Sequence, residues 1–225
     1  EFVFISVPTP TDFNSGKIDI SIVEKCFEDI AKVQENSEPI FLLRSTIVPG
    51  TTDEIKNLHP NMRIVFNPEF LTQRSANLDF INQSRFIFGG ASSDTKPVIE
   101  LYKQRFGQTI RIIDTDYKSA ELIKYMCNTF FATKVGFLNE IYQIAKKLDL
   151  DWELILEGFV SDGRIGHSHI QVPGPDGKFG FGGACFPKDV NALINYADTI
   201  GISLNTLKGA WETNLLVRPE RDWED

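Results

Sequence analysis

The residues of this chain with the clearest chemical potential surround Cys185, in the stretch FGFGGACFPKDV at 179–190. Pro187 suits the first position of a helix, because its ring fixes φ near the helical value and its missing N–H is not needed there. Cys185 is therefore expected beside a helix N-terminus, where the helix dipole and the N–H groups of the first turn favour a thiolate. Lys188 adds local positive charge, and Asp189 falls in the first turn, where negative charge is favoured.

The glycines before Cys185 are the second feature of this stretch. Gly180, Gly182 and Gly183 carry no side chains, so a ligand can approach the backbone closely there. Together the two features are typical of a nucleophilic cysteine. A buried structural cysteine in a tight turn is the alternative interpretation.

Two histidines leave a different reaction open. His167 and His169 lie 18 and 16 residues upstream of Cys185, on a glycine-containing loop. A Cys–His hydrolase would use one of them as its general base. Solvated loop histidines are the alternative interpretation.

Three polar side chains elsewhere are candidates to support the cysteine. Lys124 and Asn128 are four residues apart in SAELIKYMCNTFF, so they share one face of a helix and could hold an oxyanion. Glu69 follows a strand and a proline in FNPEFLTQRSA, and open α/β sheets place ligands at the carboxyl ends of their strands. Glu69 is thus a candidate general base, although a solvated helix face and a surface carboxylate are the plainer interpretations.

The elements that must position these residues alternate between strands and helices in the first half of the chain. Short apolar runs predict strands at 2–7, 39–46, 62–68, 84–90 and 109–114. Helical spacing and start signals predict helices at 18–33, 51–58 and 93–107. This alternation indicates a parallel, doubly wound sheet. The turns SVPTPTD and RSTIVPGTT follow two of the strands and offer hydroxyls and backbone groups.

The second half of the chain is expected to be helical. A pattern without proline predicts one long helix at about 117–148, followed by helices at 151–159, 188–201 and 205–217. The fold class is therefore α/β: a partial Rossmann-like parallel sheet, then an all-helical domain built on one long helix. Because that helix is too long and too apolar to be covered by its neighbours, we expect it to form a homodimer core.

Composition excludes several classes of partner. The net charge of −8 and the pI near 5.0 argue against nucleic acid or an anionic membrane. No apolar run is long enough to span a membrane, and no signal-peptide pattern is present. Three cysteines far apart suit a reducing cytoplasm, and neither they nor the three histidines have zinc-site spacing, so no metal is expected.

The motifs resemble one family when they are taken in order. SVPTPTD, STIVPGTT, NPEFL, AELIKYMCN, GRIG and GFGGACFPKD follow the order and the approximate spacing found in nucleotide-sugar 6-dehydrogenases. The chain is therefore similar to the UDP-glucose/GDP-mannose dehydrogenase family over essentially all of its length. GFGGACFPKD is the most specific of these motifs.

The resemblance implies three domains in the family: an NAD-binding Rossmann domain, a central helical dimerisation domain and a third domain that holds the nucleotide. Residues 1–113 correspond to the C-terminal half of the first, 114–217 to the second, and 218–225 to a linker. Residues 1–112 contain no Gly-x-Gly-x-x-Gly turn, which normally holds the pyrophosphate of a dinucleotide. We therefore expect a chain truncated at both ends and inactive as it stands.

The family reaction, as the resemblance implies it, oxidises the C6 hydroxymethyl of a nucleotide sugar to a carboxylate with two NAD. Cys185 would form the thiohemiacetal and thioester, Lys124 and Asn128 would stabilise the oxyanion, Glu69 would act as general acid/base, and Asp189 would order water. The implied cofactor contacts are Val7, Pro8, Thr9, Ser45, Thr46, Gln73 and Lys188. The implied substrate contacts are Glu69, Phe70, Leu71, Lys124, Asn128, Arg164, Phe181 and Gly182.

The substrate is expected to be UDP-glucose, with a UDP-N-acetylhexosamine, GDP-mannose or an inactive dimerising fragment as alternatives. Arg164 corresponds to an arginine that reaches the substrate of the neighbouring subunit. Two departures bear on affinity and specificity. Gln73 replaces a glutamate of many UDP-glucose dehydrogenases, and the VPGPDGK loop at 172–178 is longer than in some members.

Overall fold

The structure is a computed structural model that describes residues 1–34, 39–72 and 74–224. It divides into two compact units: Glu1–Asp12 with Ile18–Lys124, called the sheet unit, and Phe13–Lys17 with Tyr125–Asp225, called the helical unit. The division falls within one continuous helix. The elements of the sheet unit up to that helix are β1 (Phe2–Ile5), α1 (Ser21–Val33), β2 (Ile40–Leu43), α2 (Thr51–Leu58), β3 (Arg63–Phe66), α3 (Ala76–Ile81), β4 (Arg85–Gly89), α4 (Ser92–Phe106) and β5 (Arg111–Thr115).

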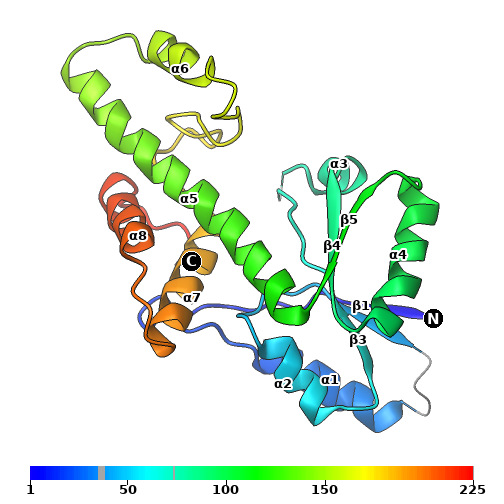
Figure 1. Ribbon diagram of the computed structural model, residues 1–225. Coiled ribbons are helices and arrows are strands. Elements are labelled where there is room, and N and C mark those ends of the chain that lie inside the picture. Colours follow the sequence, from blue (N-terminus) through cyan, green and yellow to red (C-terminus); the bar gives the residue numbers. More distant parts are fainter. Residues whose placement is uncertain (35–38, 73, 225) are drawn as a thin grey trace. The chain divides into compact units, whose positions relative to one another are not determined.

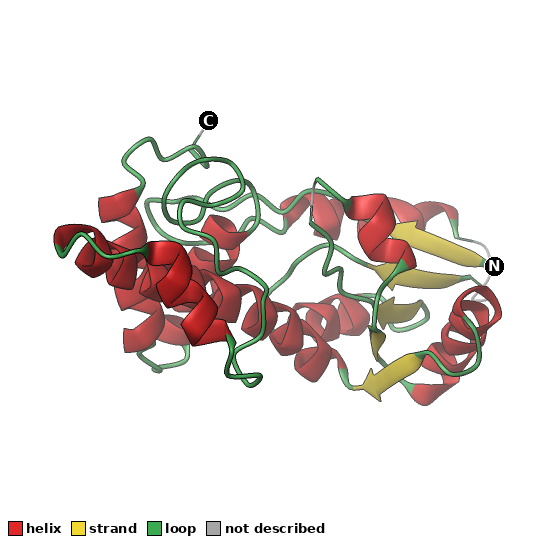
Figure 2. Cartoon of the chain, turned by 90° about the horizontal axis from the view of Figure 1, so that it is seen from above, coloured by secondary structure: helices red, strands yellow, loops and turns green. Residues whose placement is uncertain are grey.

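The strands form one sheet in the order β1-β2-β3-β4-β5. They are drawn in yellow in Figure 2. β1, β2 and β3 are parallel, and β4 and β5 are parallel to each other. The Rossmann-like, mainly parallel sheet expected from the sequence is therefore confirmed.

One junction departs from that expectation, because β3 meets β4 antiparallel through the single pair Phe66↔Gly89. A parallel neighbour needs a full crossover, usually through a helix that packs on the sheet. The connection from β3 to β4 contains the short helix α3, which the apolar periodicity does not predict. Alternation of strands and helices therefore indicates the fold class but leaves the direction of each strand open.

Helices cover both faces of the sheet. Along β2 and β3 the side chains alternate between two apolar clusters. One cluster packs with α1, α2 and the start of the long helix at 117–147, and it contains Phe41, Leu43, Ile64 and Phe66. The other packs with α4 and contains Ile40, Leu42 and Val65. Figure 1 shows α1 and α2 on one side of the strands and α4 on the other. Burial on both faces explains why these strands are apolar without alternation.

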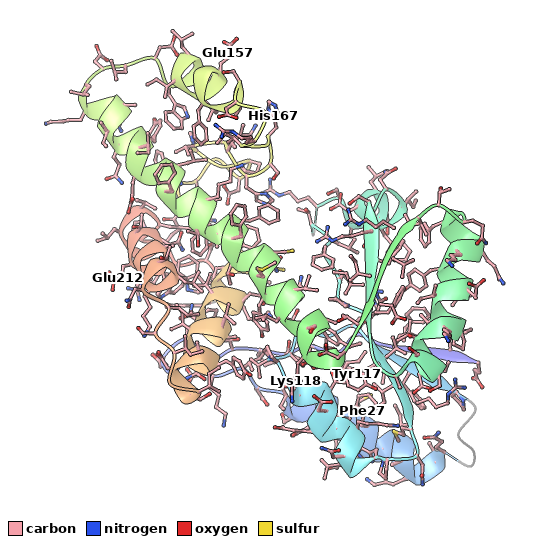
Figure 3. The ribbon with its side chains drawn as sticks, viewed as in Figure 1. Phe27, Tyr117, Lys118, Glu157, His167 and Glu212 are labelled. Carbon is pink, nitrogen blue, oxygen red and sulfur yellow. The ribbon has the colours of Figure 1, made fainter. Side chains whose placement is uncertain are left out.

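The first eight residues of the long helix α5 (Tyr117–Lys147), which make about two turns, belong to the sheet unit. Tyr117 donates a hydrogen bond from its hydroxyl to the Ile64 carbonyl at 2.7 Å, and Lys118 pairs with Asp53 of α2 at 3.4 Å. Both residues are labelled in Figure 3, as is Phe27, a buried residue of α1 in the same apolar cluster. The long helix predicted at about 117–148 is thus confirmed.

The helical unit contains the rest of α5 and three further helices. Its core joins Ala132 of α5 to Val190 and Leu207, which lie on α7 (Phe186–Thr199) and α8 (Asn205–Val217). The remaining helix, α6 (Trp152–Val160), contacts α5 through the rings of Trp152 and Tyr142, whose centroids are 5.3 Å apart. The α7 helix begins at Phe186, so Pro187 takes its second position rather than the first position expected from the sequence.

Candidate active site

The two turns expected to contact a cofactor lie at the carboxyl ends of neighbouring parallel strands. The first, Val7 to Thr9, follows β1, and the second, with Ser45 and Thr46, follows β2. The Ser45 hydroxyl donates to the Val7 carbonyl at 2.7 Å, which ties the two turns together. Ser45 and Thr9 are buried, while Pro8 is exposed. This edge of a parallel sheet is where open α/β proteins bind nucleotides.

Glu69 is held at the next strand end by an arginine that sequence reasoning missed. Arg44 places one guanidinium nitrogen 3.3 Å from the Glu69 carboxylate and donates to the Asn67 side-chain oxygen at 2.5 Å. The Tyr102 hydroxyl donates to the same Asn67 oxygen at 2.8 Å. Glu69 itself is partly exposed, so the arrangement orients a carboxylate that remains accessible.

Lys124 is buried in the sheet unit and donates a hydrogen bond from its ammonium to the Glu69 carbonyl oxygen. The ammonium also lies 5.4 Å from the centroid of the Phe70 ring, a cation–π distance. The structure therefore brings Lys124 together with Glu69 and Phe70, three residues that the sequence singled out separately. Leu71 is partly buried beside them in sequence, and Gln73 lies outside the described residues.

Glu121 was not predicted and has a clear structural role in the sheet unit. Its carboxylate accepts hydrogen bonds from the Gly50 and Thr52 backbone N–H groups at 2.6 and 2.9 Å, and from the Thr52 hydroxyl at 2.5 Å. It thereby caps the N-terminus of α2 from a distant helix. Burial raises the pKa of Glu121 to about 7, although these hydrogen bonds oppose the shift.

In the helical unit, Cys185 is exposed and occupies the N-cap position of α7. This confirms the helix start expected beside it. Asp189, in the first turn of α7, is 1% exposed and accepts a hydrogen bond from the Asn128 amide at 2.6 Å. The Lys188 ammonium lies 2.6 Å from the other Asp189 oxygen. Asn128, Lys188 and Asp189 therefore form one connected polar group at the helix that begins after Cys185.

The remaining predicted residues of the helical unit lie in contrasting surroundings. The Phe181 ring is buried in the core, between the rings of Phe186 and Trp211, at centroid distances of 6.4 and 6.1 Å. Gly182 follows it in the same loop. Arg164 is exposed and pairs with Asp162 at 2.5 Å. The roles assigned to these residues remain predictions.

One of the two candidate histidine bases is packed between aromatic rings. His169 stacks on Phe131 with centroids 4.2 Å apart and lies 5.4 Å from the ring of Phe186, the residue after Cys185. Burial lowers the pKa of His169, and the Lys134 charge adds to this effect. Within residues 1–34, 39–72 and 74–224, no His, Cys, Asp or Glu cluster that could hold a metal ion is found.

The sheet unit has polar residues at its strand ends, and the helical unit has a polar group beside Cys185. Together with the fold, these features are typical of a dehydrogenase with a Rossmann-like sheet, a long helix and a helical domain. Sequence comparison agrees, because the model of the NAD binding domain of the UDP-glucose/GDP-mannose dehydrogenase family matches residues 1–106, and the model of that family's central domain matches residues 118–215. The chain belongs to the UDP-glucose/GDP-mannose dehydrogenase family. NAD is accordingly the cofactor of the matched domain, as the sequence predicted.

Individual relatives support this assignment. The chain is 34% identical to a UDP-glucose 6-dehydrogenase of Bacillus subtilis, over 95% of this chain and 48% of the relative. It is 33% identical to a UDP-glucose 6-dehydrogenase of Rickettsia felis, over 95% of this chain and 47% of the relative. The chain thus spans about half the length of the curated relatives it matches.

Solved structures show the same similarity. A UDP-glucose dehydrogenase from Pyrobaculum islandicum superposes with a TM-score of 0.83 at 28% identity, over 96% of this chain and 50% of that one. A GDP-mannose dehydrogenase from Pseudomonas aeruginosa superposes with a TM-score of 0.67 at 28% identity, over 96% of this chain and 51% of that one. In the described part of the chain, none of the helices combines the length and the apolar character that crossing a membrane requires.

Proposed function

We propose that the protein carrying this chain is a nucleotide-sugar 6-dehydrogenase that converts UDP-glucose to UDP-glucuronate, with Cys185 as its nucleophile. The observation that supports this most directly is the position of Cys185. Cys185 is exposed and occupies the N-cap position of α7, one turn before a buried carboxylate, Asp189, that is hydrogen-bonded to Asn128 and Lys188. In this proposal residues 1–113 belong to the cofactor domain and residues 114–217 to the dimerisation and catalytic domain.

The turns after β1 and β2, which the hydrogen bond from Ser45 to Val7 links, are suited to contact part of a dinucleotide. They present hydroxyls and backbone groups at the carboxyl edge of a parallel sheet, where Val7, Pro8, Thr9, Ser45 and Thr46 would hold NAD, with Lys188 and Gln73 as further contacts. When bound, NAD accepts a hydride from C6 of the sugar in each of two oxidations.

The chain's own residues act on the sugar between these oxidations. The Cys185 thiolate attacks the C6 aldehyde, and the new alkoxide is a thiohemiacetal oxyanion. We assign Lys124 and Asn128 to this oxyanion, because an ammonium and an amide N–H stabilise developing negative charge. The amide of Asn128 has two N–H donors, of which one is committed to Asp189.

The second oxidation leaves a thioester, which is a carboxylic acid derivative that water can attack. Hydrolysis breaks the bond between C6 and sulfur, forms the carboxylate and returns the Cys185 thiolate. Glu69 is assigned as the acid/base group because it is partly exposed yet oriented by Arg44. Asp189 is assigned to order the attacking water. Phe70, Leu71, Phe181 and Gly182 would line the nucleotide sugar.

A homodimer forms part of the same proposal. Five apolar side chains of α5 are between 48% and 63% exposed and fall on one side of the helix: Leu122, Met126, Phe130, Phe137 and Ile144. At about 100° per residue they lie within an arc of about 80°. Arg164, exposed in the loop after α6, would reach the partner's substrate.

NADH formation by the whole protein tests the proposal. UDP-glucose, a UDP-N-acetylhexosamine and GDP-mannose are supplied in parallel, and the C6 carboxylate is identified by mass spectrometry. We expect UDP-glucose to give the largest kcat/KM and Cys185→Ser to abolish uronate formation. Preference for one of the other sugars would correct the substrate, whereas uronate formed by Cys185→Ser would refute the nucleophile.

Two other functions predict different results. A dimerising scaffold predicts no NADH with any nucleotide sugar. A Cys–His hydrolase predicts that changing His169 to Gln abolishes a hydrolytic activity that requires no NAD.

A further inference from the structure

The loop before Cys185 is held through its backbone by two buried asparagines of the helical unit. Asn139 of α5 accepts a hydrogen bond from the Gly180 N–H at 3.0 Å. Asn214 of α8 accepts from the Phe181 N–H at 2.7 Å and donates its own amide N–H to the Phe181 carbonyl at 2.9 Å. Both asparagines are at most 2% exposed. A buried amide that satisfies both groups of one peptide residue specifies the position of that residue.

A buried arginine, Arg218, holds the same loop at Phe179, the residue before Gly180. Arg218, just after α8, is 1% exposed and donates to the Phe179 carbonyl at 3.1 Å. Its guanidinium also lies 2.7 Å from carboxylate oxygens of both Asp176 and Asp222. The charge is thus compensated by two carboxylates and by a backbone oxygen. The guanidinium is buried while both carboxylates are partly exposed, so the buried charge depends on these partners.

The glycines of the motif fit these side chains closely. Gly180 has φ of +66°, and a Cβ there would lie 2.3 Å from the Asn214 side-chain oxygen. A Cβ on Gly182 would lie 2.3 Å from a guanidinium nitrogen of Arg218. Neither position can therefore take a side chain without displacing the group that holds the loop. The absence of a side chain at these two glycines lets Asn214 and Arg218 approach the loop closely enough to hold its backbone.

The other side of Cys185 is fixed by α7. The Asp189 N–H donates to the Cys185 carbonyl at 2.9 Å, and Pro187 is buried. Between the held loop and Cys185 lie Gly183 and Ala184, which are both exposed. The thiol therefore sits at the end of a two-residue span between two anchored segments. Its position depends on both anchors.

We propose that Arg218 and Asn214 are positioning residues for Cys185, acting through the backbone of residues 179–182. This role rests on the proposed function, because it concerns the step in which the thiol meets the C6 aldehyde. A displacement of about 1 Å at a reacting atom can lower a rate by about a hundredfold. The first oxidation, which precedes the thiol's attack, depends less on this placement than the second. Loss of the anchor therefore uncouples the two oxidations.

The test compares Arg218→Met with Arg221→Met in the whole protein. Arg221 lies three residues further along, is exposed and pairs with Glu224, so it matches the loss of charge without touching the loop. NADH and uronate are quantified together, and the reaction is stopped before hydroxylamine is added to trap the C6 aldehyde that the enzyme has released. Hydrogen exchange of the peptide covering residues 179–184 is measured on the same samples.

Arg218→Met is expected to exchange amide protons at 179–184 at least about tenfold faster, and to lower uronate formation by about ten- to a hundredfold. The trapped aldehyde should rise, so that more than two NADH form per uronate. Arg221→Met should keep two NADH per uronate and unchanged exchange. A purely structural role would lower both oxidations together, in proportion to the folded fraction, and leave the ratio at two.

Arg218→Lys provides a second variant should Arg218→Met not fold. Lysine keeps a positive charge beside Asp176 and Asp222 but lacks the planar fork that also reaches the Phe179 carbonyl. We expect a smaller rise in trapped aldehyde in the same direction. A ratio of two in both folded variants, or unchanged exchange at 179–184, overturns the positioning role while the proposed function stands. Absence of NADH from the wild type overturns the proposed function and this role with it.

Discussion

Cys185 differs from the other two cysteines in its surroundings. It is exposed at a helix N-terminus, whereas Cys26 packs against the core of the sheet unit and Cys127 is partly buried. Burial also raises the pKa of the Cys26 thiol, with a further contribution from Asp29, so its reactive thiolate is disfavoured.

We therefore predict that iodoacetamide labels Cys185 first in the native chain. Peptide mass spectrometry should show at least about tenfold slower labelling at Cys26, because thiolate fraction and access govern the rate. The same experiment in urea is the control, in which all three thiols should react at similar rates. Equal labelling of the native protein would contradict the prediction.

Arg44 is a nearly buried charged residue that links three polar side chains of the sheet unit, Asn67, Glu69 and Tyr102. Arg44→Ala removes the partner of Glu69 and a donor to Asn67. We predict a loss of about 1–3 kcal/mol in the free energy of unfolding, measured by urea denaturation. Arg105→Ala, on the exposed side of α4, should change it by less than about 0.5 kcal/mol. Identical midpoints for the two variants would show that the Arg44 contacts contribute little.

At the scale of elements, Glu121 links α5 to the N-terminus of α2. Its folded-state pKa of about 7 lies above the ordinary value of 4.5. Between these two pH values the folded state binds more protons than the unfolded state, so this carboxyl group contributes most stability below about pH 4.5. The contribution is lost as pH rises through 7.

The prediction concerns the difference in unfolding free energy between the wild type and Glu121→Gln. That difference should shrink by at most about 3 kcal/mol from pH 5 to pH 8, because glutamine does not titrate. Glu54→Gln, on the exposed side of α2, is the control and should show a constant difference. A difference that grows with pH would mean that the hydrogen bonds from Thr52 outweigh burial.

The exposed apolar side of α5 predicts self-association. Phe130→Glu places a charge in the middle of the five exposed side chains, and we expect it to convert a dimer to a monomer at micromolar concentration. Light scattering measures the mass, and Leu154→Glu, at an exposed apolar position of α6, is the matched control. A wild-type chain that is monomeric at the same concentration would refute the homodimer.

For the whole molecule, the expected cofactor edge offers the turns after β1 and β2, while residues 1–112 contain no Gly-x-Gly-x-x-Gly turn. Such a turn supplies the backbone donors and the helix N-terminus for a pyrophosphate. Since charge-assisted hydrogen bonds contribute about 1.5–3 kcal/mol each, we predict that this 225-residue chain binds NAD no more tightly than about millimolar. Micromolar binding by calorimetry would show that other residues hold the pyrophosphate.

Much of this molecule is determined by local sequence. The apolar runs that become β2 and β3, the long period of α5 and the proline at the start of α7 act within a few residues, so strands, helices and the placement of Cys185 could be predicted. The order of motifs was specific enough to indicate the family, which the comparisons confirm.

Tertiary structure alone decided which distant residues meet. The antiparallel junction of β3 and β4 depends on the path of the connection, which periodicity does not describe. Arg44 beside Glu69, Glu121 at the start of α2, and Arg218 at the Phe179 carbonyl join residues 25, 69 to 71 and 39 positions apart. In each case at least one of the two groups is buried, and a buried polar group requires a hydrogen-bonding partner that the nearby sequence does not record.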